Sequence, residues 1–130
     1  MDLILTLHGL LRWLVAIAGI IAIIKFAIGW LTKAEYQPID KRIMSLFTIS
    51  LDINLLLGLI LLFGLGGGFL PDRLEHATTM ILAVIVAHLS IIWRNSSNSA
   101  VKFRNNLIVV VIALLLVFMG VMRLRGDWLF

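Results

Sequence analysis

Three histidines, His8, His76 and His88, are the side chains of this chain best suited to chemistry. The sequence contains no cysteine, so disulfides, iron–sulfur clusters and thiolate metal sites are excluded. Imidazole nitrogens bind haem iron, and two imidazoles from different helices can hold one haem between them. The histidines therefore raise the question of which elements bring two of them together.

The composition indicates an integral membrane protein whose main partner is the lipid bilayer. Of 130 residues, 62% are hydrophobic and 14% are charged, whereas soluble domains are about 45–50% apolar and about 25% charged. The net charge of +4 does not indicate nucleic-acid binding, because the basic residues are spread around the ends of the apolar runs.

Four apolar runs predict membrane-spanning helices at about residues 3–31, 44–65, 72–93 and 107–122. Each approaches the 20 or so residues that a span needs. The connections are short, so consecutive helices are expected to be antiparallel neighbours. The predicted fold class is all-α, an up-down-up-down four-helix bundle forming a single transmembrane domain over residues 1–130.

The distribution of lysine and arginine predicts the orientation. Residues 32–42 and 94–106 together carry six of these side chains, so the positive-inside rule places both loops in the cytoplasm and both termini outside. We expect a multi-pass protein of a bacterial inner membrane. Trp30, Trp93 and Trp128 fall at predicted membrane boundaries, as an aromatic belt would.

Five polar side chains from three helices are expected to cluster toward the outer side: His8, Arg12, Glu75, His76 and Arg123. His8 and His76 are the predicted axial ligands of a haem b iron, because helices 1 and 3 are diagonal in a simple bundle. Arg12 and Arg123 are predicted to bind its propionates through charge-assisted hydrogen bonds.

A second group, Lys25, Asp52 and His88, lies roughly 9–12 Å inside the opposite boundary at 1.5 Å per residue. The twelve residues from His76 to His88 turn a helix by about 120° and advance it by about 18 Å. His88 therefore cannot share the face of His76, and three histidines allow only one bis-histidine haem per chain. We expect Asp52 and His88 to pair as a proton-carrying or quinone-binding couple.

Structural interpretations of these residues stay open. His88 could be a hydrogen-bonded packing residue, and His8 could simply be hydrated near the outer boundary. Glu75 with His76 could be an interfacial pair at a helix start. Lys25 could extend its amine toward the cytoplasmic headgroups.

Three segments, "LHGLLRWLV" at 7–15, "LFTISLDINLLLGLILL" at 46–62 and "RLEHATTMILAVIVAHL" at 73–89, resemble a family of small bacterial four-helix membrane proteins often labelled cytochrome b-like. The resemblance covers about half of the chain. It implies that His8, Arg12, Glu75, His76 and His88 are family positions. Where the pattern suggests glutamine in helix 2, this chain has Asn54.

The expected function is that of a haem b-binding membrane subunit for electron transfer in a larger membrane complex or a homodimer, with quinone as a candidate redox partner. We expect an electron-transfer or accessory subunit rather than a stand-alone enzyme, because the chain has no room for a soluble catalytic domain. The alternative is a haem-free structural subunit. The third hypothesis is a small proton or ion carrier that uses Lys25, Asp52 and His88.

Overall fold

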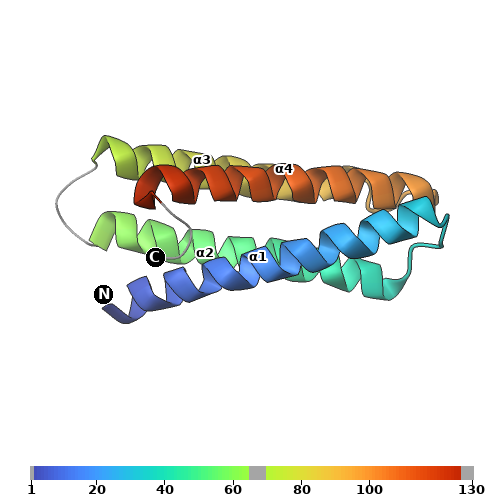
Figure 1. Ribbon diagram of the computed structural model, residues 1–130, viewed down its shortest axis with the longest axis horizontal. Coiled ribbons are helices and arrows are strands. Elements are labelled where there is room, and N and C mark those ends of the chain that lie inside the picture. Colours follow the sequence, from blue (N-terminus) through green and yellow to red (C-terminus); the bar gives the residue numbers. More distant parts are fainter. Residues whose placement is uncertain (1, 65–69, 127–130) are drawn as a thin grey trace.

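The computed structural model describes residues 2–64 and 70–126, which are almost entirely helical (Figure 1). The elements in chain order are α1 (Asp2–Leu31), α2 (Pro38–Gly64), α3 (Pro71–His88), the 3₁₀-helix η1 (Leu89–Trp93) and α4 (Ser99–Arg125). The described part of the chain contains no strand, as predicted for an all-α bundle.

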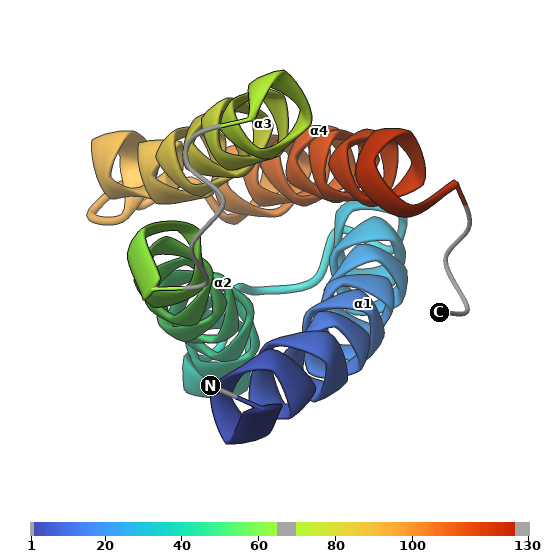
Figure 2. The same cartoon turned by 90° about the vertical axis from the view of Figure 1, so that its left-hand side faces the viewer.

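The helices run alternately up and down, and the bundle has two layers. Viewed along its length, α3 and α4 form one layer, and α1 and α2 form the other (Figure 2). Helix α1 packs against α2 and α4, and α3 packs against α4 and α2, so α1 and α3 are diagonally opposite as expected. We call the two ends of the bundle the His8 end, where α1 begins, and the Tyr36 end, where the α1–α2 loop lies.

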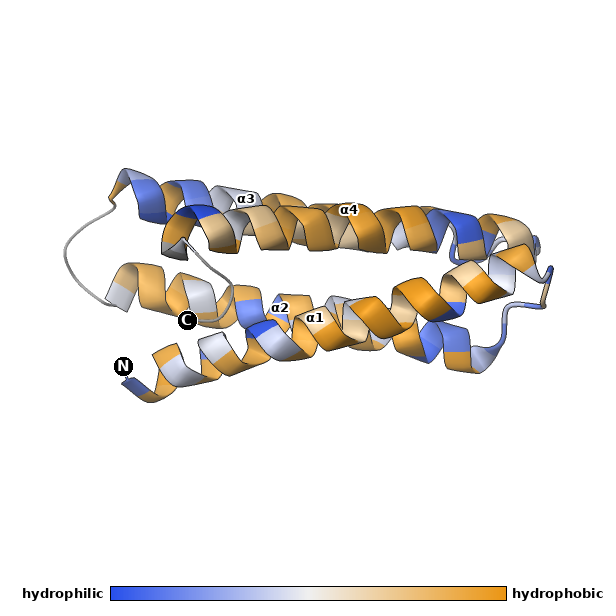
Figure 3. Ribbon diagram, in the orientation of Figure 1, coloured by the Kyte–Doolittle hydropathy of each residue, from blue (hydrophilic) through white to orange (hydrophobic). Residues whose placement is uncertain are grey.

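All four helical segments are long and apolar enough to cross a membrane, which makes this a multi-pass membrane protein. The middle of the bundle is hydrophobic, and most hydrophilic residues gather toward its two ends (Figure 3). Large aliphatic side chains such as Ile20, Ile53 and Ile85 are about half exposed there. Exposed aliphatic surface in the middle of a bundle is suited to contact with acyl chains, not water.

Two helices are longer than their apolar runs. Helix α2 starts at Pro38 rather than near residue 44, and α4 starts at Ser99 rather than near residue 107. Proline is favoured in the first turn of a helix, and the side chain of Asn98 caps α4 by accepting a hydrogen bond from the Val101 amide. Hydropathy locates the part of a helix that lies in lipid, whereas these capping residues locate the start of the helix itself. The α1–α2 and α3–α4 loops therefore shrink to residues 32–37 and 94–98.

Aromatic side chains fill the bundle at the Tyr36 end. Phe26, Phe47 and Phe103 are fully buried, and the Tyr36 ring packs on Phe103 with centroids 5.1 Å apart. Further along, the core is made of smaller residues, among them Val15, Ala18, Ala83, Val117 and Val121. These smaller side chains fill less of the space between the helices toward the His8 end than the phenylalanines fill at the Tyr36 end.

Hydrogen bonds tie three elements together at the Tyr36 end. The Trp93 indole Nε1–H donates to Asn106 Oδ1 at 2.7 Å, and Asn106 Nδ2–H donates to the Tyr36 hydroxyl at 2.9 Å. Trp93 thus lies in the interior network as well as near a predicted boundary. Trp30 is exposed, and the predicted boundary residue Trp128 lies outside the described residues.

Candidate functional site

The structure brings the rings of His8 of α1 and His76 of α3 close together across the bundle, in an edge-to-face arrangement. Their ring centroids are 6.5 Å apart, and the ring planes are nearly perpendicular at 88°. Two imidazoles that share one metal ion through bonds of about 2 Å have centroids roughly 6 Å apart, since each nitrogen lies about 1 Å from its ring centre. The separation of His8 and His76 is thus close to that of a pair of axial ligands.

Each histidine is held by a backbone carbonyl of a neighbouring helix. His8 Nδ1 lies 3.1 Å from the carbonyl oxygen of Asn54 in α2, and His76 Nδ1 lies 3.0 Å from that of Gly120 in α4. A carbonyl oxygen only accepts, so Nδ1 carries the donated proton in both rings and Nε2 keeps its lone pair when the ring is neutral. Histidines that bind metals usually donate their other ring nitrogen in this way.

Gly58 provides the space that His8 needs beside α2. A Cβ added at Gly58 would lie 3.0 Å from His8 Cε1, closer than ordinary carbon contacts of about 3.5–4.0 Å. Gly58 is also four residues after Asn54, so its amide is the usual helical partner of the carbonyl that His8 contacts. The "LGL" segment therefore matters for a steric reason that hydropathy does not reveal.

A cavity of about 550 Å³ lies beside the two histidines, within the range of about 300–1,000 Å³ of small-molecule and cofactor sites. All four helices contribute to its wall, which is mostly aliphatic, with Leu51, Leu59 and Val117 as examples. Asn54 also lines it, and the Asn54 Oδ1 atom is buried without a hydrogen-bond partner among the described residues. The cavity thus combines an apolar wall with a few polar groups.

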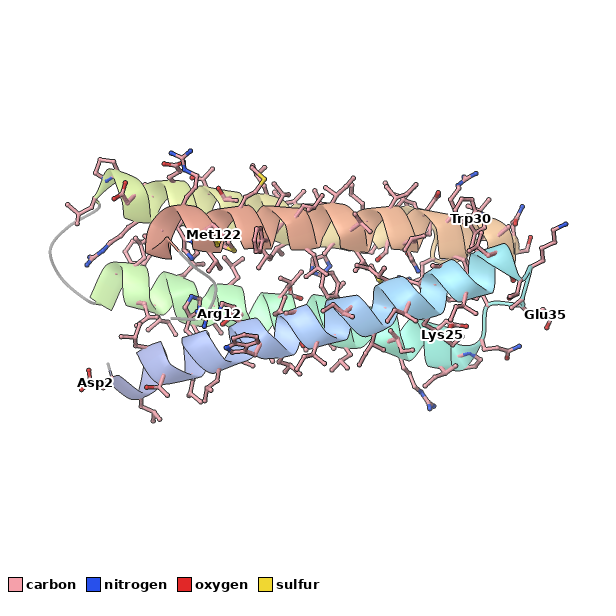
Figure 4. The ribbon with its side chains drawn as sticks, viewed as in Figure 1. Asp2, Arg12, Lys25, Trp30, Glu35 and Met122 are labelled. Carbon is pink, nitrogen blue, oxygen red and sulfur yellow. The ribbon has the colours of Figure 1, made fainter. Side chains whose placement is uncertain are left out.

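Two arginines line this cavity, and only one of them was expected there. Arg12, one turn after His8, is 4% exposed, and its guanidinium lies 5.7 Å from the centroid of the Trp13 ring. Figure 4 shows Arg12 and Lys25 on opposite halves of α1. Arg73 is the second, and it was not among the site residues predicted from the sequence. Its position three residues before His76 is the signal that places both on one helix face.

Arg123, predicted to serve the same cofactor, does not line the large cavity. Its Nε lies 2.6 Å from Glu75 Oε1, and the two side chains are 70% and 45% exposed. Together with Asp72, Thr79 and one edge of His76, this ion pair lines a separate pocket of about 30 Å³, about the volume of one water molecule. Arg73 therefore takes the place beside the cavity that the sequence assigned to Arg123.

The second predicted group is only partly assembled. His88 Nε2 lies 2.8 and 3.0 Å from the two carboxylate oxygens of Asp52, so the expected couple between α3 and α2 is present. Lys25 instead donates to Asp40 Oδ1 at 2.6 Å, and Asp40 is fully buried. Asp40 could not be foreseen as its partner while residues 32–42 were expected to form a loop. The other Asp40 oxygen accepts from the Gln37 amide, which caps the start of α2.

His8 and His76 by themselves offer two side-chain ligands to a metal ion. The described residues contain no group of three or more histidine, cysteine, aspartate or glutamate side chains that could bind a bare metal ion. A porphyrin would supply four further nitrogens to an iron ion bound by these two histidines.

Comparison of the chain with protein-family models, with curated proteins and with solved structures found no match. The functional argument therefore depends on the residues and their geometry.

Proposed function

We propose that this chain is a haem b-binding membrane protein that transfers electrons. The observation that carries the proposal is the pair of imidazoles from diagonal helices, 6.5 Å apart at ring centroids and each anchored through Nδ1. Bound haem b supplies a one-electron Fe(III)/Fe(II) couple.

His8 and His76 are the proposed axial ligands. Their bonds to the carbonyls of Asn54 and Gly120 fix the ring orientation and favour Nε2 as the ligating atom. Because each anchor belongs to the neighbouring helix, both ligands are oriented before a cofactor arrives. Such preorganisation lowers the cost of binding.

The residues that line the cavity suit the porphyrin ring and the propionates of haem b. The aliphatic side chains of the cavity would exclude water from an apolar macrocycle. Arg12 and Arg73 line the same cavity as donors for carboxylate groups. Arg73 replaces Arg123 in this role.

We propose that the protein lies in a bacterial inner membrane with loops 32–37 and 94–98 in the cytoplasm, which places His8 and His76 toward the outer side. The basic side chains around these loops, such as Lys33, Arg94 and Lys102, support this orientation. A larger complex or a homodimer would supply the electron donor and acceptor.

The test is a reduced-minus-oxidised visible spectrum of the purified protein, with a pyridine haemochrome assay for stoichiometry. We expect a low-spin b-type spectrum at one haem per chain. His8→Ala and His76→Ala should each abolish it, because either change removes one axial ligand. His88→Ala is the matched control and should leave it unchanged, because His88 pairs with Asp52 instead.

A colourless protein that stays colourless after haem is added would overturn the proposal. It would favour the haem-free accessory subunit, in which His8 and His76 only hydrogen-bond across helices. Retention of the spectrum in both His8→Ala and His76→Ala would refute the ligand assignment. The carrier hypothesis loses support because Lys25 pairs with Asp40 instead of joining Asp52 and His88.

A further inference from the structure

The Asp52–His88 pair is an ionisable couple in the middle of a membrane-spanning bundle, and it is not buried. Each of the two side chains is 42% exposed. The nearby α2 residues Ile49 and Ile53 and the α3 residue Ile85 are also exposed. The surface around the pair is therefore aliphatic, and in a membrane it faces acyl chains.

The depth of the pair limits what can reach it. Asp52 lies fourteen residues after Pro38 and twelve before Gly64, which is about 21 and 18 Å from the two ends of α2. Phospholipid headgroups lie about 15 Å from the middle of a bilayer whose hydrocarbon core is about 30 Å thick. A headgroup therefore does not reach the pair, and a binding molecule must dissolve in the hydrocarbon.

The hydrogen bonding of the pair defines the chemistry of that molecule. A carboxylate only accepts, so His88 Nε2–H donates to Asp52, and Nδ1 of the neutral ring is left as an acceptor. His88 Nδ1 makes no hydrogen bond to any described residue, whereas the Nδ1 atoms of His8 and His76 both do. A polar atom without a hydrogen bond costs free energy in hydrocarbon, so a ligand that donates a hydrogen bond to this exposed acceptor would be stabilised there.

We propose that Asp52 and His88 form a binding site for the headgroup of a membrane-soluble hydroquinone. The hydroquinone hydroxyl donates to His88 Nδ1, Asp52 holds the imidazole, and the apolar tail lies along the isoleucines. As a redox partner of the chain, this ligand rests on the proposed haem function. The binding of the hydroquinone to Asp52 and His88 does not depend on haem, so the binding proposal and the haem proposal can fail separately.

The experiment measures the dissociation constant of a short-chain alkyl benzohydroquinone in nanodiscs that contain the haem-free protein, corrected with protein-free nanodiscs. The dimethyl ether of the same molecule is the matched ligand, because it has the same shape and cannot donate. We expect the hydroquinone to bind at least tenfold more tightly than its ether, which is about 1.4 kcal/mol.

The protein variants are Asp52→Asn, which keeps the shape of the side chain, and His88→Phe, which removes the acceptor. Each should raise the dissociation constant at least tenfold while leaving the helical circular dichroism unchanged. Thr48→Val is the matched control, because Thr48 lies one turn from Asp52 and, among the described residues, its hydroxyl bonds only to the Ser45 carbonyl. It should bind like the original protein.

Equal binding of hydroquinone and ether, or equal effects of Thr48→Val and Asp52→Asn, would overturn the proposal. So would binding that is lost in Gly58→Leu but kept in Asp52→Asn, because that pattern places the ligand in the His8 cavity. A dimer that dissociates on Asp52→Asn would also overturn it, since a second copy would then cover the pair.

Discussion

Replacing Asn106 by leucine should loosen the Tyr36 end of the bundle, where interhelical hydrogen bonds are concentrated. Asn106 is 4% exposed. It accepts from Trp93 Nε1 and donates to the Tyr36 hydroxyl, so one side chain of α4 joins η1 to the α1–α2 loop. Leucine has a similar volume and can make neither bond.

The expected loss follows from the number of bonds. Interhelical hydrogen bonds in a membrane protein contribute about 0.6 kcal/mol on average and about 1.7 kcal/mol at most. Two bonds therefore give a loss of about 1–3.5 kcal/mol in the free energy of unfolding. Leucine offsets part of this loss by burying more apolar surface, so we expect about 1–3 kcal/mol.

The assay is unfolding in mixed micelles of dodecylmaltoside and dodecyl sulfate, followed by circular dichroism. Asn105→Leu is the matched control, because within the described residues the Asn105 side-chain oxygen accepts only from its exposed neighbour Arg104. The control should stay within about 0.5 kcal/mol of the original protein. Tyr36→Phe completes a double-mutant cycle and should give a coupling of roughly 0.6 kcal/mol with Asn106→Leu.

The reasoning is refuted if Asn106→Leu unfolds at the same detergent ratio as Asn105→Leu, or at a higher one. A coupling of zero between Tyr36 and Asn106 would refute the Tyr36 part alone.

Two further predictions concern the two ends of the bundle. At the His8 end, Gly58→Ala should reduce the retention of haem about tenfold, because its Cβ would press on His8 Cε1. Gly19→Ala is the steric control in the haemochrome assay, because its Cβ would lie even closer to a neighbour, 2.5 Å from Leu114 Cδ1, but would not touch His8. An unaltered haem content in Gly58→Ala would contradict the assigned contact. At the Tyr36 end, burial and then the nearby Asp40 carboxylate raise the pKa of Tyr36 from 10.0 to about 12, against a smaller lowering by the bond from Asn106. Tyr36 is the single tyrosine of the chain, so its absorbance titration should show a midpoint near 12 when folded. The unfolded chain loses the hydroxyl proton of Tyr36 at a lower pH than the folded chain does. The contribution of the protonated Tyr36 to the free energy of unfolding is therefore complete below about pH 10 and is lost as the pH rises toward 12. A folded midpoint near 10 would rule out the burial of this hydroxyl.

The sequence by itself determined the fold class. Four apolar runs with short connections can satisfy their backbone groups in lipid only as helices, and short loops make successive helices antiparallel. The diagonal placement of the helices that carry His8 and His76 follows from that order, and so does the different face of His88. Residue type and helical periodicity were sufficient for these predictions because both are local properties.

The helix ends and the partners of the charged residues depended on tertiary structure. Hydropathy reports the segment in lipid, so the polar first turns of α2 and α4 were missed, and with them the pairing of Lys25 with Asp40. Arg73 lines the cavity, whereas Arg123 forms an ion pair with Glu75 instead.

The space beside the histidines was likewise decided only in three dimensions. The sequence shows that residue 58 is glycine, but it does not show that the His8 ring lies where a Cβ of residue 58 would be. Whether His8 reaches the Asn54 carbonyl depends on the distance between α1 and α2 at Gly58. That distance results from packing along both helices, which a local pattern of residues does not encode.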